Sequence, residues 1–119
     1  MVAPASRDEE SRLRALAEYR ILGTQPEQCY DDITTIASLT CGTPISLMSL
    51  VDADKQWFKS RYGFETKETK RDVSFCAHAI LSPVPLIVED ALEDERFKLN
   101  PLVVKEPKIR LYAGFPLQT

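Results

Sequence analysis

The apolar residues near the start of the chain recur three and four positions apart, with charged residues between them. This spacing predicts a helix over about residues 8–21. Ser6 and Glu9 stand at the spacing of a capping box, in which a hydroxyl and a carboxylate bond to the open N–H groups of the first turn. Residues 1–7 are expected to form a disordered tail. The apolar positions that define the helix are Leu13, Leu16 and Ala17.

A second helix is predicted from about residue 27 to Gly42. Pro26 suits a position near its start, where the missing N–H costs little. Gly42 suits its C-terminal end, and Pro44 cannot continue a helix. One apolar face of this helix carries Cys29, Ile33, Ile36, Ala37 and Thr40.

From residue 45 onward the pattern changes to that of strands. Residues 45–51 are almost continuously apolar, which indicates a strand that is buried on both faces or central in a sheet. The polar residues 52–55 are typical of a turn. An aromatic-rich run over residues 56–64 follows, so the two runs predict an antiparallel hairpin.

The second half of the chain alternates short helices with short strands. Residues 65–72 are polar and predict a loop, and residues 73–81 predict a short helix with Ser74 as its N-cap. The later predictions are a strand at 86–90, a short acidic helix and a loop over 91–104, and a strand at 108–117. Because this order is not a strict strand–helix alternation, it predicts an α+β fold with an antiparallel sheet.

The size and charge of the chain limit the range of functions that it could have. A chain of 119 residues is enough for one domain, and its apolar and charged fractions are those of ordinary soluble domains. A formal net charge of −3 gives no general attraction to nucleic acid or to a membrane surface. No apolar run is long enough to cross a bilayer, and the start does not read as a secretion signal. The three cysteines form no C-x-x-C pair, so reduced thiols in the cytoplasm are expected, with no metal site.

Four separate blocks then carry a resemblance to a known family. They read LVDADKQWFKSRYG at 50–63, RDVSFCAHAI at 71–80, VEDALEDERFKLNP at 88–101 and IRLYAGFPL at 109–117. In this order and spacing the chain closely resembles a GAF domain. The resemblance is narrower still to the GAF domains at the front of bacterial-type sensor histidine kinases and diguanylate cyclases, and it covers about residues 13–117.

The resemblance implies a fold and a role. The fold is PAS-related, with helices packed on an antiparallel sheet, in a single domain over residues 8–119. A complete member continues past YAGFPL with further strands and a closing helix, so the resemblance implies a domain that is truncated at its C-terminus. The implied role is that of a non-catalytic sensory or regulatory module in signal transduction. Such a module binds a small molecule or transmits a signal through dimerising helices to an attached output domain.

The only histidine of the chain stands two residues after a cysteine, which raises the question of a shared site. Residues two apart on a helix point to different sides, so Cys76 and His78 are not expected to share a ligand or a proton. The large and apolar residues of this region, such as Phe75, are expected mainly to pack in the core. Arg71 and Asp72 are expected to form an ion pair on the surface. If a ligand pocket exists, the residues expected to line it are Trp57, Phe58, Arg71, Phe75, Cys76 and His78.

Alternatives from other classes stay open at this stage. One is a thiol-based redox enzyme, similar to the GAF-type methionine sulfoxide reductases, that uses Cys76. Another is a ligandless dimerisation scaffold, since the first helix fits its own sheet and a second copy equally well. A bilin is not expected, because the segment that matches the attachment region has no cysteine. No cofactor is predicted, and a homodimer and an output domain are the expected partners.

Overall fold

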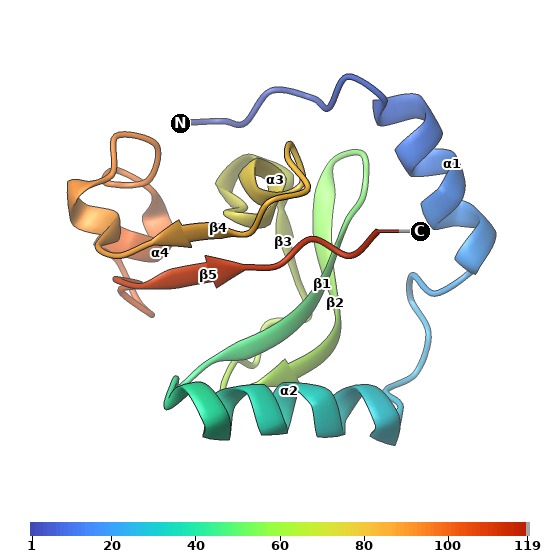
Figure 1. Ribbon diagram of the computed structural model, residues 1–119, viewed down its shortest axis with the longest axis horizontal. Coiled ribbons are helices and arrows are strands. Elements are labelled where there is room, and N and C mark those ends of the chain that lie inside the picture. Colours follow the sequence, from blue (N-terminus) through green and yellow to red (C-terminus); the bar gives the residue numbers. More distant parts are fainter. Residues whose placement is uncertain (119) are drawn as a thin grey trace. The chain divides into compact units, whose positions relative to one another are not determined.

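The computed structural model describes residues 1–118, and it divides into two compact units. The first, here called the hairpin unit, comprises residues 10–69. The second, here called the α3 unit, comprises residues 1–9 together with the chain from residue 70 onward (Figure 1). Both units combine helices with antiparallel strands, so the predicted α+β class is confirmed.

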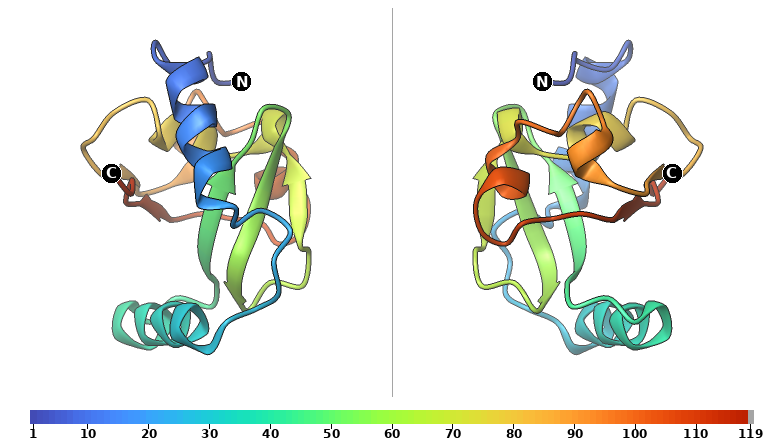
Figure 2. Two further views of the ribbon diagram at one scale, coloured as in Figure 1. Left: turned by 90° about the vertical axis from the view of Figure 1, so that its right-hand side faces the viewer. Right: turned by 90° about the vertical axis from the view of Figure 1, so that its left-hand side faces the viewer.

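The hairpin unit contains the two long helices and the three-stranded sheet. Its elements are α1 (Glu9–Tyr19), α2 (Gln28–Cys41), β1 (Ser46–Val51), β2 (Lys55–Tyr62) and β3 (Glu68–Lys70), of which only the end residues Glu9 and Lys70 fall in the α3 unit. The strands lie side by side in the order β1-β2-β3 (Figure 2). The two helices and the hairpin fall where the sequence predicts them. The loop predicted over residues 65–72 is wrong in part, because its middle pairs as β3 and its end forms the 3₁₀ turn η1 (Arg71–Val73).

The β1–β2 pair contains an irregularity that the hydrophobic pattern does not reveal. Met48 lies opposite Ser60 and Ser49 lies opposite Phe58, so Lys59 has no partner across the ladder. An extra residue of this kind bends and twists a strand locally. As a result, three consecutive residues of β2, from Phe58 to Ser60, are all buried, although strict alternation would turn the middle one outward.

The helix α2 packs with an unexpected face. Its buried residues are the polar Thr34 and Ser38, and Ile33 and Ile36 are 53% and 61% exposed. Thr34 Oγ1 lies 2.8 Å from Ser60 Oγ on β2, so the helix is held to the sheet by a polar contact. The C-terminal end is as predicted, since Gly42 adopts the left-handed conformation at φ 66°.

The α3 unit is built from short elements. After η1 come α3 (Cys76–Ala79), β4 (Leu86–Val88), the 3₁₀ turn η2 (Ala91–Glu93), α4 (Pro101–Val104) and β5 (Tyr112–Gly114). The strands β4 and β5 pair antiparallel as a separate two-stranded sheet, from Leu86 opposite Gly114 to Val88 opposite Tyr112. The expectation of one sheet is therefore corrected to two, and the predicted strand over 108–117 pairs over three residues.

An aromatic cluster forms the core of the α3 unit. The rings of Phe75 and Phe97 stack with centroids 4.1 Å apart, and Phe75 is 3% exposed. Val88, Ala91 and Val103 complete the buried cluster. Because these residues come from five separate segments, the cluster ties the short elements of the unit together.

Candidate functional site

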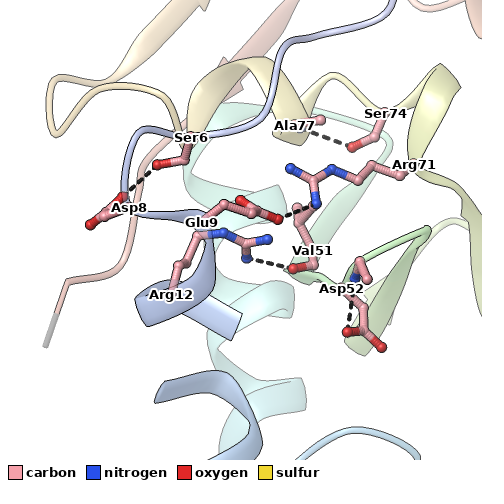
Figure 3. Close-up of polar contacts among 10 residues, drawn as sticks. Ser6, Asp8, Glu9, Arg12, Val51, Asp52, Arg71, Ser74 and Ala77 are labelled. Carbon is pink, nitrogen blue, oxygen red and sulfur yellow. Dashed lines mark hydrogen bonds and ion pairs between the residues drawn. The ribbon is translucent and has the colours of Figure 1, made fainter. Parts of the chain in front are cut away.

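The α3 helix brings the cysteine and the histidine of the sequence motif into the structure. The hydroxyl of Ser74 accepts a hydrogen bond of 3.0 Å from the Ala77 N–H (Figure 3), which supports the predicted capping role of Ser74. The helix that follows is four residues long, from Cys76 to Ala79. It therefore fixes the side chains of Cys76 and His78 on different sides.

The two side chains contact different partners. The sulfur of Cys76 lies 3.2 Å from the hydroxyl of Tyr112 on β5. The Nε2 atom of His78 lies 3.0 Å from the carbonyl oxygen of Met1. Because a carbonyl can only accept, Nε2 carries the proton of this bond. The imidazole also packs against the Phe97 ring in a T-shaped arrangement, with centroids 4.8 Å apart.

The pKa of His78 is lowered in this environment. Desolvation by burial is the largest cause, and the nearby guanidinium of Arg96 adds to it. The bond to the Met1 carbonyl and the carboxylate of Asp94 act in the opposite direction but do not outweigh them. His78 is therefore a neutral imidazole at neutral pH, and it offers one N–H donor.

Tyr112 is a site residue that the sequence reasoning missed. Burial, followed by the neighbouring Cys76, raises its pKa, so the phenol stays protonated. A Cβ atom on Gly114 would lie 2.3 Å from the Tyr112 hydroxyl, so the glycine leaves the room that the ring occupies. The signal was present in the sequence as tyrosine and glycine two residues apart, because such residues share one face of a strand.

His78 lines an open cleft of about 480 Å³ in the α3 unit. Apolar residues make up most of its wall, and His78, Ser82 and Arg96 are its polar members. A cleft of this size falls in the range of small-molecule sites, which combine apolar walls with a few polar groups. The lining residues are Met1, Pro4, His78, Ala79, Leu81, Ser82, Val84, Pro85, Leu86 and Arg96.

Arg96 is held in place at the edge of this cleft. Its Nε and Nη2 atoms donate to the two carboxylate oxygens of Asp94 at 3.0 and 2.8 Å, and its guanidinium lies 5.2 Å from the centre of the Phe97 ring. The hydrogen bonds from Arg96 lower the pKa of Asp94, and those to Asp94 raise the pKa of Arg96. The pair therefore stays ionised across the physiological range.

Arg71 has a different partner from the one expected. Its Nη1 donates to the Glu9 carboxylate at 2.5 Å, and the two side chains are only 13% and 19% exposed (Figure 3). The predicted surface pairing with Asp72 is thus corrected to a largely buried pair with the first residue of α1. The Glu9 carboxylate forms this pair, and the Glu9 backbone N–H donates to the Ser6 carbonyl. The Ser6 hydroxyl donates to the Asp8 carboxylate, so the side chains of Ser6 and Glu9 do not bond as the predicted capping box requires.

The six predicted pocket residues divide between the two units. Trp57 and Phe58 lie on β2 of the hairpin unit, where Phe58 is buried edge-on against Phe64 and Trp57 is half-buried. Arg71, Phe75, Cys76 and His78 lie in the α3 unit. Of these four, His78 lines the cleft, whereas Phe75 is packed in the core.

A buried lysine in the hairpin unit was also not anticipated. The ammonium of Lys59 contacts Glu27 Oε2 at 2.7 Å, Thr24 Oγ1 at 2.7 Å and the Gln25 carbonyl at 2.6 Å. All three donors of the Lys59 ammonium are thus used, and this group fastens the segment before α2 to the sheet.

Over residues 1–118 no cluster of three or more histidine, cysteine, aspartate or glutamate side chains could hold a metal ion. In the same range, no helix is long and apolar enough to span a membrane.

Comparisons with known proteins extend the sequence resemblance. A family model described as a GAF domain matches residues 25–119. Over 116 residues the chain is 40% identical to a cyclic di-GMP phosphodiesterase of Pseudomonas aeruginosa. The match covers 98% of this chain and 20% of that protein, so the chain spans about one fifth of the length of this relative.

Proposed function

Because the chain belongs to the GAF domain family, a family of regulatory and sensory modules, we propose that it is the ligand-responsive part of a cytoplasmic signalling protein. In this proposal the domain itself carries out no chemistry. It binds a small molecule in the cleft beside His78 and thereby regulates an output domain on the same polypeptide. The relative, a cyclic di-GMP phosphodiesterase, is consistent with a role in signalling. The match covers 20% of that protein, which supports the proposal that this domain is one part of a longer polypeptide.

The cleft is the observation that carries the proposal. Its wall is mostly apolar, and it presents a neutral imidazole donor at His78 together with a guanidinium at Arg96 that Asp94 already holds in place. Apolar surface gives affinity, and a few fixed polar groups give orientation and specificity. Because the cleft borders α3, occupancy can favour one arrangement of this unit over another, which is the population shift that regulation requires.

Native mass spectrometry of the full chain, purified without added ligand, tests this function. The Ser82→Trp variant fills the cleft from an exposed position on its wall, and Pro83→Trp is the matched control on a neighbouring exposed residue outside the wall. A retained small molecule on wild type and Pro83→Trp that is lost from Ser82→Trp is the expected result. Equal retention by all three proteins would show that the molecule binds elsewhere, and it would refute the proposal that this cleft is the ligand site.

A dimerisation scaffold is a second candidate, and the exposed apolar face of α2 favours it. Ile33, Ile36 and Leu39 are more than half exposed on one helix, and such surface tends to become covered in an assembly. Analytical ultracentrifugation of wild type and Ile36→Glu distinguishes the two roles. A dimer without bound ligand that Ile36→Glu dissociates supports the scaffold.

The redox alternative has a direct test as well. If Cys76 reduces methionine sulfoxide, Cys76→Ser loses that turnover, because a serine hydroxyl cannot form the sulfur–sulfur bond that follows. Turnover that is absent from wild type, or unchanged in Cys76→Ser, removes this alternative.

A further inference from the structure

The N-terminal segment of the chain contributes two residues to the wall of the candidate cleft. We call residues 1–8 the N-terminal strap. At its first residue, the Met1 carbonyl accepts a hydrogen bond of 3.0 Å from His78, and the Met1 nitrogen donates to the Arg96 carbonyl at 3.0 Å. Met1 and Pro4 form part of the cleft wall. The strap, which runs from the end marked N in Figure 1, therefore contacts His78 and Arg96, two of the three polar residues of the cleft wall.

The other end of the strap is fixed much more firmly. Glu9, the first residue of α1, forms the largely buried ion pair with Arg71. Residues 1–6 belong to no helix or strand, and the side chain of Val2 is 59% exposed. Segments with few buried contacts open at low free-energy cost, whereas buried pairs do not. Residues 1–6 can thus leave the cleft while Glu9 stays in place.

We propose that the N-terminal strap is a displaceable cover of the cleft, which a ligand replaces at His78. The inference rests on the proposed function and adds its regulation. The contacts of Met1 also define the chemical class of ligand. His78 Nε2 donates to a carbonyl oxygen in the covered state, so the ligand carries a hydrogen-bond acceptor at that point. The remaining wall is mostly apolar, so the rest of the ligand is an apolar body.

Displacement of the strap gives the domain an output. The strap leads directly into α1 at Glu9, so the contacts that order residues 1–8 also restrain the backbone just before this helix. When a ligand takes the place of Met1 and Pro4, that constraint is lost while the Glu9–Arg71 pair remains. The ligand-bound and ligand-free states then differ in the order of residues 1–8, a change of the order–disorder type used by many switches.

The experiment uses 8-anilinonaphthalene-1-sulfonate as the probe, because it combines an apolar ring system with an acceptor group. Fluorescence titration of the full chain gives its Kd, and ¹⁵N heteronuclear NOE values report the order of the strap at Val2, Ala3 and Ala5 on the picosecond–nanosecond timescale. Pro4→Gly removes an apolar strap contact with the cleft and loosens the backbone. Pro83→Gly is the matched control at an exposed position outside the cleft wall.

We expect the probe to lower the NOE values of the strap about twofold in wild type. Pro4→Gly is expected to show low values without probe and a Kd about threefold to tenfold tighter, since the strap no longer competes. Pro83→Gly is expected to match wild type in both measurements.

Two results would overturn the proposal, and they have different meanings. If the probe binds wild type and Ser82→Trp abolishes that binding, but the NOE values do not change and Pro4→Gly binds with the wild-type Kd, the strap is no cover. The cleft and the proposed function then stand. If the probe binds neither wild type nor Pro4→Gly, or if it binds Ser82→Trp unchanged, the cleft is no ligand site and both proposals fall.

Discussion

Replacing Gly114 by alanine tests how closely Tyr112 is held beside Cys76. The added Cβ atom would lie 2.3 Å from the Tyr112 hydroxyl and 2.7 Å from its Cζ atom, far inside van der Waals contact. The ring has little freedom to move aside. It packs 5.0 Å from the Phe75 ring, and its hydroxyl lies 3.2 Å from the Cys76 sulfur. Either the ring or the strand β5 must therefore shift.

The expected cost combines two contributions. Forcing extra volume into a packed site costs about 1–3 kcal/mol, and loss of the Tyr112–Cys76 hydrogen bond costs up to about 1 kcal/mol. We expect Gly114→Ala to lower the free energy of unfolding by about 1–4 kcal/mol, and the middle of that range corresponds to a fall in Tm of roughly 10 °C for a domain of this size. Urea unfolding followed by far-UV circular dichroism measures the change.

A double-mutant cycle with Tyr112→Leu identifies the cause. Leucine is too short to reach Gly114, so the second substitution should remove most of the cost of the first, with a coupling free energy above about 1 kcal/mol. Gly42→Ala is the control, because its Cβ atom meets nothing within 4 Å and its φ of 66° alone costs about 1 kcal/mol. That cost should not depend on residue 112. Additivity of Gly114→Ala and Tyr112→Leu within about 0.5 kcal/mol would refute the steric argument.

Three further predictions concern charge and orientation. Because burial lowers the pKa of His78 in the folded protein, the unfolded chain binds the proton more readily, and stability should fall as the pH drops from about 7.5 to about 5.5; urea unfolding at each pH should show a flatter profile for His78→Gln. Lys59→Met removes a buried charge, and its partner Glu27, which is 56% exposed, regains water. Glu27→Gln instead leaves the Lys59 ammonium buried without its carboxylate, so it should lower the free energy of unfolding at least as much as Lys59→Met does. A cost of Lys59→Met that exceeds that of Glu27→Gln by more than about 1 kcal/mol, measured by thermal unfolding, would contradict this prediction. Ile36→Ser should change the free energy of unfolding by less than about 0.5 kcal/mol. Ser60→Ala, at the polar contact with α2, should lower it by about 1–3 kcal/mol. A larger cost for Ile36→Ser than for Ser60→Ala would show that the face of α2 carrying Ile36 is the packed one.

Much of the local structure could be predicted because its signals lie close together in the sequence. Gly42 ends α2 in the left-handed conformation that glycine adopts without strain. The turn at residues 52–55 joins two runs of strand-forming residues, and the Ser74 hydroxyl bonds three residues onward. In each case the interacting groups are a few residues apart, so the pattern contains both partners.

The packing face of α2 shows where this reasoning stops. Helical spacing shows which residues share a face, but it does not show which face the rest of the chain covers. The buried face holds Thr34 and Ser38, because Ser60 on β2 supplies a hydroxyl partner at 2.8 Å from Thr34. That partner lies 26 residues away and stands beside the irregularity at Lys59.

The candidate site follows the same division. The sequence by itself determined the α+β class, the positions of the long helices and the hairpin, and the separation of Cys76 from His78, because each depends on periodicity over a few residues. Only the tertiary structure placed the Met1 carbonyl on His78 across 77 residues and Glu9 on Arg71 across 62. Such contacts join segments with no local relation along the chain, so no pattern over a few residues contains both partners.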